Sequence, residues 1–406
     1  MLSRVLLLCL VGFSFAEVFK IPLKKEVKKS GGPQFLQSNG QRLEYVALDH
    51  VFIGTVSLGT PLQDVNVAFD TQSGIFWVPD DKCPCDEDCS NERLCFDMCS
   101  SHCCSQGGGN STVFEDDDKN TAPLGVCSHK NVYNPKQSST YVSRRASTVE
   151  TFLNKNITIN LAYETFRLGP HHAGGFTTNY LQFGHVNDLP QAYEDAQYDG
   201  IFGLGRVGPR GSKAPIKQLA DKRIISNPVV TLSVTNGKES TQFFDGVLTV
   251  GQIDEAFCPL NTSKFIPVAS ANKWNFRVFK ATLDGTSVND LTWTARVDPS
   301  SPFIHIPIKL WNGIKDKLTH DAENDRYTAR CSVLNSLFSS FHIYIGTEDC
   351  AVPRSQFIVE YSSQLCELLV RPAAEKDDQW VLGIPFLHER CVVLDYNGRI
   401  GISDFK

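Results

Sequence analysis

The segment FIGTVSLGTPLQDVNVAFDTQSGIFWVP, residues 52–79, decides the fold class of this chain. Its apolar residues fall in short runs rich in Val, Ile and Phe, and Gly, Pro and Asp interrupt these runs. Short runs of β-branched and aromatic residues bounded by turn residues are typical of strands. The same spacing begins at about Val46 and continues through PVVTLSV and GVLTV. The sequence therefore predicts an all-β sandwich or barrel-like protein.

Helices are expected to be few and short. The best candidates are APIKQLADK around Lys217 and IKLWNGIKDKL from Ile308. With 406 residues, of which 41% are hydrophobic, the chain can bury a large core. That length favours two domains or lobes over one.

The N-terminal residues 1–16, MLSRVLLLCLVGFSFA, are typical of a cleaved signal peptide. They hold Arg4, an apolar run, and the small residues Ser14 and Ala16. A membrane anchor is the weaker alternative, because the run is shorter than the roughly 20 apolar residues that a spanning helix needs. We therefore expect a secreted protein or a protein of the secretory-pathway or lysosomal lumen, without a membrane span.

Residues 17–45 are expected to form a short basic propeptide-like leader. Within residues 17–42, six Lys and Arg face two Glu, while the whole chain carries a net charge of -6. The remaining body is acidic, which argues against a nucleic-acid partner. Two interpretations of the leader stay open: Lys24, Lys25, Lys28 or Lys29 pairs with buried aspartates, or the leader is simply solvated. In neither case do we expect it to be core.

Cysteine usage predicts an oxidising compartment. The chain has 14 cysteines, and removal of Cys9 with the signal leaves 13, so at least one thiol is free or intermolecular. Residues 81–130 interrupt the strand pattern and are expected to form a surface insertion that disulfides staple. Its eight cysteines are Cys83, Cys85, Cys89, Cys95, Cys99, Cys103, Cys104 and Cys127. Zinc is the weaker alternative, because paired C-x-x-C units are missing. The pairing is left open, and no metal or cofactor is expected.

Three sequons predict glycosylation. They begin at Asn110, Asn156 and Asn261 and fit a secreted glycoprotein.

Two distant turns place an Asp directly after an apolar strand. They are VAFDTQSG, which contains Asp70, and TARVDPSSP, which contains Asp298. If the two carboxylates face each other, they share one proton, because like charges at short distance cannot both ionise easily. One carboxylate is then the general base on a water, and the other is the general acid on a peptide carbonyl. On this pattern alone, two ordinary turn aspartates are the alternative.

Six segments in a fixed order make the chain similar to the pepsin family of aspartic peptidases. They are residues 52–79, SSTY at 138–141, FTTNYLQFG followed by YDGIFGLG up to 205, GVLTVGQID at 246–254, KWNFRVFKATLDG at 273–285, and WVLGIPFLHERCVVLDYNGRIGIS at 380–403. The resemblance implies a bilobal all-β fold with a shared central sheet and a peptide-binding cleft that a hairpin flap closes. It implies an N-terminal lobe at 46–228 and a C-terminal lobe at 229–406.

The resemblance also suggests one disulfide and the nature of the leader. Cys331 and Cys366 resemble the family's C-terminal-lobe disulfide, and IPLKKE from Ile21 resembles the start of its propeptide. Cys258, Cys350 and Cys391 remain, and one of them is expected to be unpaired.

By resemblance the catalytic pair is Asp70 and Asp298, but both signatures depart from the family's Asp-Thr-Gly. The loops continue as Thr71, Gln72 and Ser73 and as Pro299, Ser300 and Ser301. In the family the two threonines interlock the loops, whereas Pro299 has neither a hydroxyl nor a backbone N–H. Gln72 is expected to put its amide next to the position of the attacking water.

The flap is expected to differ as well. Phe152 stands where the family has a tyrosine, so it covers the cleft but cannot hydrogen-bond to Trp77. Leu153, Asn154 and Lys155 follow, with the Asn156 sequon at the tip. His305 is expected to be an ordinary loop or core residue.

These residues predict a monomeric, inactive or impaired peptidase homologue that binds a peptide or protein in its interlobe cleft. Misplacing catalytic groups by about 1 Å costs on the order of a hundredfold in rate. The alternative is an active aspartic endopeptidase that hydrolyses peptide bonds at acidic pH through Asp70, Asp298 and an activated water.

Overall fold

The computed structural model describes residues 19–27, 34–38, 41–45, 50–86, 89, 95, 99–104, 125–172, 175–234, 246–259, 265–283, 286–322, 325–339, 341–374 and 379–404. For residues 22, 24–27, 34–38, 41–45, 50 and 286 it describes the backbone alone. The expected signal peptide, the sequons at Asn110 and Asn261, and the side chains of Lys24, Lys25, Lys28 and Lys29 therefore lie outside the described residues.

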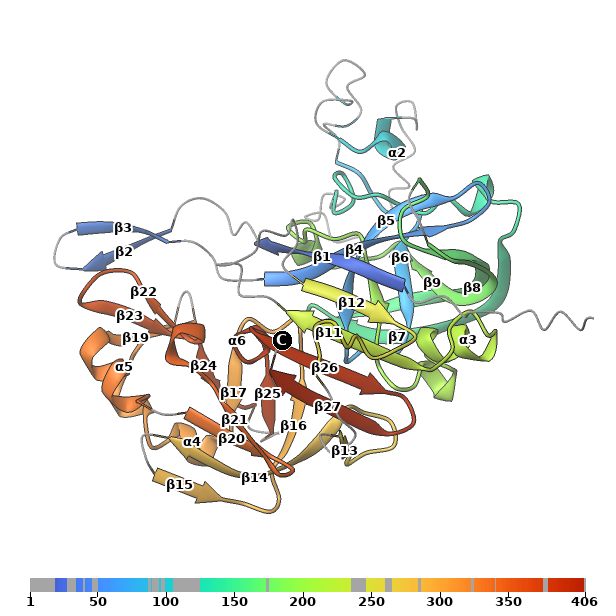
Figure 1. Cartoon of the computed structure of the whole chain (residues 1–406). Helices are drawn as coiled ribbons and strands as arrows, with labels where there is room; N and C mark the ends of the chain where they lie inside the picture. The colour runs from blue at the N-terminus through green and yellow to red at the C-terminus, as the bar shows by residue number, and fades with distance from the viewer. Residues whose placement is uncertain are drawn as a thin grey trace, which may run out of the picture.

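The fold is bilobal and all-β, and one 13-stranded sheet runs through both lobes (Figure 1). Across this sheet the strands follow the order β13 (Phe265–Pro267), β27 (Arg399–Asp404), β26 (Arg390–Asp395), β11 (Val229–Val234), β12 (Gly246–Val250), β1 (Phe19–Val27), β4 (His50–Leu58), β5 (Gln63–Asp70), β10 (Gly200–Gly203), β6 (Phe76–Pro79), β9 (Thr177–Val186), β8 (Lys155–Leu168) and β7 (Val142–Phe152).

The other described strands form three smaller sheets. The first has eight strands: β21 (Glu348–Ala351), β20 (Phe341–Ile345), β14 (Asn275–Leu283), β16 (Thr294–Val297), β25 (Trp380–Leu382), β17 (Ile304–Ile306) and β24 (Val370–Pro372), with β15 (Thr286–Asn289) beside β14. The second has four: β18 (Thr319–Asp321), β19 (Arg326–Arg330), β23 (Leu365–Leu368) and β22 (Ile358–Glu360). The third is the hairpin of β2 (Gln34–Ser38) and β3 (Gln41–Tyr45).

Helices are few and short, as predicted. The two expected segments contain α3 (Pro215–Asp221) and α4 (Ile308–Trp311). The sequence reading did not anticipate α2 (Ser101–Cys104), α5 (Cys331–Leu337) and α6 (Ile384–Leu387). Within the described ranges, every helix is too short or too polar to cross a membrane.

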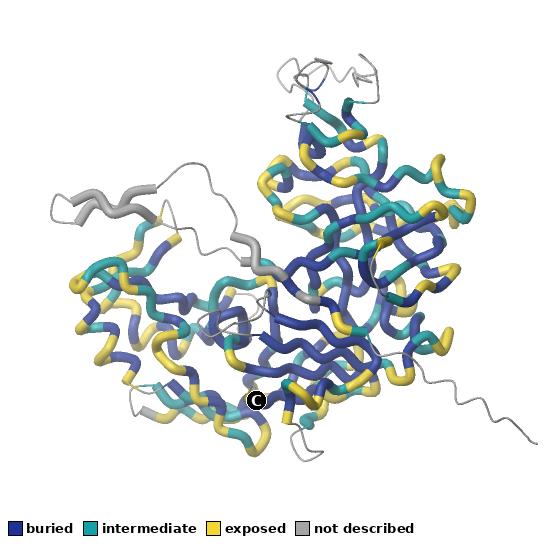
Figure 2. The backbone as a smooth tube through the Cα atoms, turned by 45° about the horizontal axis from the view of Figure 1, so that its top comes forward, coloured by how far each residue is buried: buried dark blue, intermediate teal, exposed yellow. Residues whose placement is uncertain are grey.

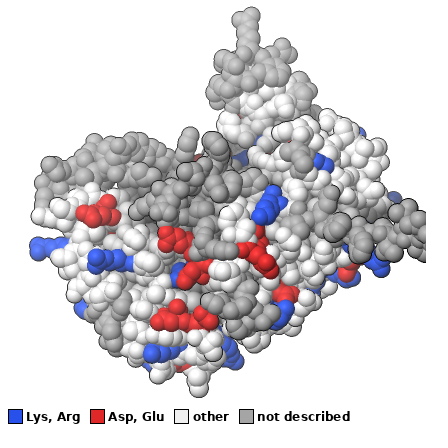
Figure 3. All heavy atoms as spheres, viewed as in Figure 1, with Lys and Arg blue, Asp and Glu red and all other residues white. Residues whose placement is uncertain are grey.

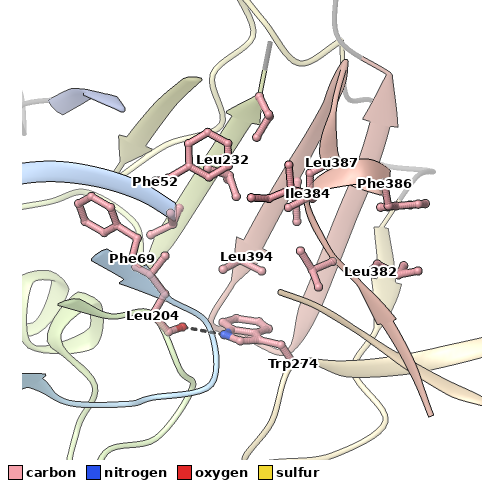
Figure 4. Packing of buried hydrophobic residues seen from close by; sticks show 14 of the residues in the cluster. Phe52, Phe69, Leu204, Leu232, Trp274, Leu382, Ile384, Phe386, Leu387 and Leu394 are labelled. Atoms are coloured by element: carbon pink, nitrogen blue, oxygen red, sulfur yellow. Dashed lines mark hydrogen bonds between the residues drawn. The ribbon is translucent and has the colours of Figure 1, made fainter. Parts of the chain in front are cut away.

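The centre of the large sheet is buried on both faces. Every residue of β11, β12 and β26 is buried, and these strands are nearly continuous apolar runs, as expected for doubly covered strands (Figure 2). Trp274 packs in this core, and its indole Nε1 donates to the Leu204 carbonyl at 2.7 Å (Figure 4). The Tyr396 hydroxyl donates to the same carbonyl at 2.8 Å. Leu204 follows β10 directly, so the core anchors the chain beside β5.

Part of the leader belongs to this core, so our expectation that it lies outside is wrong for β1. This strand pairs with β12 on one side and β4 on the other. Ile21 and Leu23 are 3% and 0% exposed, and Lys20 Nζ contacts Asp254 Oδ2 at 2.8 Å. The run of lysines hid the alternation of Ile21 and Leu23, which is the period-two pattern of a strand.

Acidic side chains gather on one part of the surface. On the face drawn in Figure 3, Asp and Glu lie around the middle, and Lys and Arg lie at separate points around them, some in contact with acidic residues.

The disulfides agree with the expected staple and with the predicted pair Cys331–Cys366. All eight cysteines of the insertion are paired, as Cys83–Cys127, Cys85–Cys103, Cys89–Cys99 and Cys95–Cys104. Of the three remaining cysteines, Cys258 pairs with Cys391, and Cys350 is free and buried. The prediction that one of these three is unpaired is confirmed.

We expect residues 17–406 to show no reactive thiol when folded and one thiol when unfolded without reductant. Burial raises the pKa of Cys350 to about 11, and the thiolate is the reactive form. Titration with a thiol reagent, before and after denaturation, measures this count. The Cys350→Ser variant should show none, and additional thiols in the unfolded wild-type chain would contradict the six pairs.

Candidate active site

Two strands of different sheets deliver Asp70 and Asp298 to equivalent turns. Asp70 ends β5, which pairs in parallel with β10, and Asp298 follows β16, which pairs in parallel with β25. Gly205 N, just after β10, donates to the Ser73 carbonyl at 2.7 Å. Ile384 N, just after β25, donates to the Ser301 carbonyl at 2.8 Å. Each turn is therefore held by an amide from the chain that follows the neighbouring parallel strand.

The two turns meet between the lobes. The Thr71 hydroxyl donates to the Val297 carbonyl at 2.7 Å, and Thr71 is buried. Burial and, after it, the negative charge of Asp298 together raise the pKa of Asp70 to about 6. The structure thus brings together the two aspartates that the sequence singled out, and their carboxylates interact.

Backbone amides support both carboxylates. Gln72 N donates to Asp70 Oδ1 at 2.7 Å, and Ser300 N donates to Asp298 Oδ1 at 3.1 Å. The residues that replace the two glycines therefore still supply these N–H donors.

The Gln72 side chain turns toward its neighbour Thr71. It is exposed, and its Nε2 donates to Thr71 Oγ1 at 3.2 Å. In the facing loop of the other lobe, Pro299 has no backbone N–H that could donate to the Thr71 hydroxyl. The Gln72 amide supplies a donor from the same loop instead.

Asp298 accepts a side-chain hydrogen bond in addition to its backbone hydrogen bond. Ser300 Oγ donates to Asp298 Oδ1 at 2.6 Å, in addition to the Ser300 amide. The guanidinium Nε of Arg296 lies 3.8 Å from Asp298 Oδ2. Sequence reasoning missed Arg296, although alternation along β16 puts residues 296 and 298 on the same face.

Glu150 is a third carboxylate at the site, and sequence reasoning missed it too. Ser73 Oγ donates to Glu150 Oε2 at 3.1 Å. Burial raises the pKa of Glu150, and the charge of Asp70 adds to the rise. Glu150 lies two residues before Phe152 on β7, so strand alternation would have placed it on the face of the flap that carries Phe152.

The β7–β8 hairpin forms the expected flap. Leu153 and Asn154 make its turn with φ of 45° and 64°, which fits the two-residue turns that match strand twist. The Phe152 ring lies 5.0 Å from the Trp77 ring, edge to face. A pocket of about 290 Å³ opens below, and Asp70, Ser300, Phe152 and Leu153 are among its lining residues.

Two further predicted residues lie nearby. His305 is half-buried on β17 with its Nδ1 3.2 Å from the Pro372 carbonyl, and burial lowers its pKa. Asn156 is exposed, two residues beyond the flap turn.

Asp70 should make stability depend on pH between about 4 and 6. Its folded pKa of about 6 lies above the ordinary aspartate pKa of 3.8, so the folded state binds this proton more tightly. This contribution is fully present below pH 3.8 and is lost as the pH rises through about 6. We expect the free energy of unfolding of wild type to fall across this window relative to Asp70→Asn. Urea unfolding at several pH values measures this, and a constant difference between the two proteins would contradict it.

The chain is similar to known proteins over most of its length. A model described as eukaryotic aspartyl protease matches residues 51–405. Aspartic protease 2 of Necator americanus is 22% identical over 450 aligned positions, covering 100% of both chains. Pepsin A of Bos taurus is 24% identical, over 88% of this chain and 84% of the relative. Pregnancy-associated glycoprotein 1 of Sus scrofa is 25% identical, over 87% of this chain and 81% of the relative. The likeness spans both turns that carry the aspartates.

Proposed function

The chain belongs to the eukaryotic aspartyl protease family, and we propose that it binds an extended peptide or protein segment in its interlobe cleft with severely impaired hydrolysis. Hydrolysis would require Asp70 and Asp298 to act together on a bound water and a peptide carbonyl.

The occupancy of the Asp298 carboxylate carries this proposal. A general base needs a free lone pair to receive the proton of the attacking water. Oδ1 already accepts the Ser300 hydroxyl at 2.6 Å and the Ser300 amide at 3.1 Å, which uses its two lone pairs. Oδ2 faces the Arg296 guanidinium, whose Nε lies 3.8 Å away. Oδ2 is therefore the one oxygen of Asp298 left to take a proton from water, and it lies beside a positive charge.

Binding does not depend on that proton transfer. The pocket below the flap is lined by apolar side chains, among them Ala68, Phe152 and Ile201, with the polar groups of Asp70 and Ser300 at one side. An apolar pocket with a few polar groups is the usual form of a ligand site. We therefore assign the pocket to a side chain of the bound segment.

An active acid endopeptidase is the second candidate, and specific contacts favour it. The Thr71 hydrogen bond to Val297 and the two backbone amide donors keep the loops in register. The raised pKa of Asp70, about 6, leaves it protonated in acid, as a general acid toward the peptide carbonyl must be. In that case Asp298 has to act as the base despite its donors.

Hydrolysis of a denatured protein by residues 17–406 between about pH 3 and 6 separates the two candidates, because the dyad needs both acids. We expect the wild-type protein to cleave no faster than the Asp70→Asn and Asp298→Asn variants. We also expect a peptide library to yield ligands of the wild-type protein, and Phe152→Ala to weaken their binding. Cleavage by wild type that either Asn variant abolishes would establish the endopeptidase instead.

We further infer that the protein matures in the secretory pathway as a monomeric glycoprotein. Six disulfides support an oxidising compartment, and the exposed Asn156 lies in a sequon that a glycosyltransferase can reach. Glycosidase treatment should lower the mass of the wild-type protein by more than that of Asn156→Gln, and an equal change in both proteins would show that Asn156 carries no glycan.

A further inference from the structure

Three side chains that can ligate metals meet on the surface of the N-terminal lobe. Asp64 lies at the start of β5, and His171 and His172 lie in the turn after β8. One ligand atom of each residue lies within 4.8 Å of the others. Tertiary packing creates this cluster, because Asp64 and His171 are 107 residues apart in the chain.

The carboxylate of the cluster is held in place from behind. The hydroxyl of Ser57, a fully buried residue, donates to Asp64 Oδ1 at 2.6 Å, and the His171 amide donates to the same oxygen at 2.9 Å. Asp64 Oδ2 lies 2.7 Å from His171 Nδ1. Groups that orient a ligand from behind commonly set the affinity of a metal site.

The turn that carries the two imidazoles is also braced. Gly169 has φ of 104°, which favours glycine, and Pro170 restricts the next residue. Arg167 Nε donates to the Pro170 carbonyl at 3.2 Å. The two imidazole rings stand edge to face with centroids 5.0 Å apart. Both imidazoles therefore project from a turn that is fixed before any ligand arrives.

We propose that Asp64, His171 and His172 bind a divalent transition ion of the zinc class. Two imidazole nitrogens and one carboxylate oxygen form a ligand set that Zn²⁺ accepts with water in the remaining position. The ion replaces the proton between His171 Nδ1 and Asp64 Oδ2, and these atoms move apart to coordinate it. Ca²⁺ and Mg²⁺ prefer sets of oxygen ligands and fit poorly.

The site is separate from the candidate active site and its effect is structural. Asp64 and Asp70 lie at opposite ends of β5, and six residues of strand span roughly 20 Å. A bound ion would tie the turn after β8 to the start of β5. The other described cluster of this kind, Cys85, His102 and Cys103, has both sulfurs in one disulfide.

Zinc binding to residues 17–406, measured by competition with a chromogenic chelator, tests the proposal. We expect one Zn²⁺ per chain, at least about tenfold weaker binding in His171→Ala, His172→Ala and Asp64→Asn, and no such binding of Mg²⁺. His342→Ala is the matched control, because His342 Nδ1 contacts Asp349 Oδ1 at 2.8 Å in the same way. Among the described residues, no third metal-ligating side chain completes a cluster with this pair.

The thermal midpoint gives an independent readout. Zn²⁺ should raise it in wild type and His342→Ala and leave it unchanged in His172→Ala, because a ligand that binds only the folded state stabilises that state. Equal zinc affinity in wild type and both histidine variants, or a loss in His342→Ala as large as in His172→Ala, would overturn the site. Neither outcome depends on whether the chain hydrolyses peptides.

Discussion

The double substitution Ser300→Gly with Pro299→Thr is expected to raise peptide hydrolysis at acidic pH by at least about a hundredfold, since general acid–base catalysis contributes 10² to 10⁴ in rate. Removing the Ser300 hydroxyl frees one lone pair of Asp298 Oδ1, where it now donates at 2.6 Å. The backbone amide of residue 300 stays in place to support the carboxylate. Threonine at 299 restores an N–H and a hydroxyl opposite Thr71.

Two controls decide what such a gain means. Ser301→Ala removes the neighbouring hydroxyl, which donates to the Phe303 carbonyl at 3.0 Å and not to Asp298, so it should not raise the rate. Adding Asp70→Asn to the double variant should abolish the gain, because the carboxylate pair needs both acids. If the double variant stays as inactive as wild type, the Ser300 hydroxyl is not what limits hydrolysis.

Substituting Leu23 by Ala is expected to lower the free energy of unfolding by about 2–5 kcal/mol, the usual cost of emptying a core leucine site. Leu23 is 0% exposed on β1, and its backbone pairs with Gly246 of β12. The loss would show that the leader strand stabilises the folded chain rather than merely covering it.

Urea unfolding of residues 17–406 measures this effect. Leu291→Ala is the control, because Leu291 is 74% exposed and its truncation should change stability by no more than about 0.5 kcal/mol. A similar small change for Leu23→Ala would mean that β1 contributes little to the sheet, and that the leader can be lost without cost to the fold.

The family and the outline of the site could be read from the sequence. Local patterns predicted the all-β class and the turns of Asp70 and Asp298, and the resemblance to the family implied the bilobal arrangement and the Cys331–Cys366 pair. The odd count predicted a free thiol, the cysteine-rich insertion and the family-like Cys331–Cys366 pair left three candidates, and packing selected Cys350.

The sequence reading failed where a residue's role depends on a distant neighbour. It expected the leader to lie outside the core because lysines dominate its composition, yet β1 is paired between β12 and β4, and Ile21 and Leu23 are buried. It also missed the hydrogen bond from the Gln72 amide to Thr71, which compensates for the missing N–H of Pro299 across the interface.

The sequence by itself determined the fold class and which two carboxylates to compare, because alternation and turn chemistry are properties of neighbouring residues. Only the tertiary structure decided what surrounds those carboxylates. The contacts that matter join residues from separate strands and loops: Thr71 with Val297, Ser73 with Glu150, and Asp64 with His171. Such contacts arise when sheets pack, and only packing sets the distances on which hydrogen bonding and charge interactions depend.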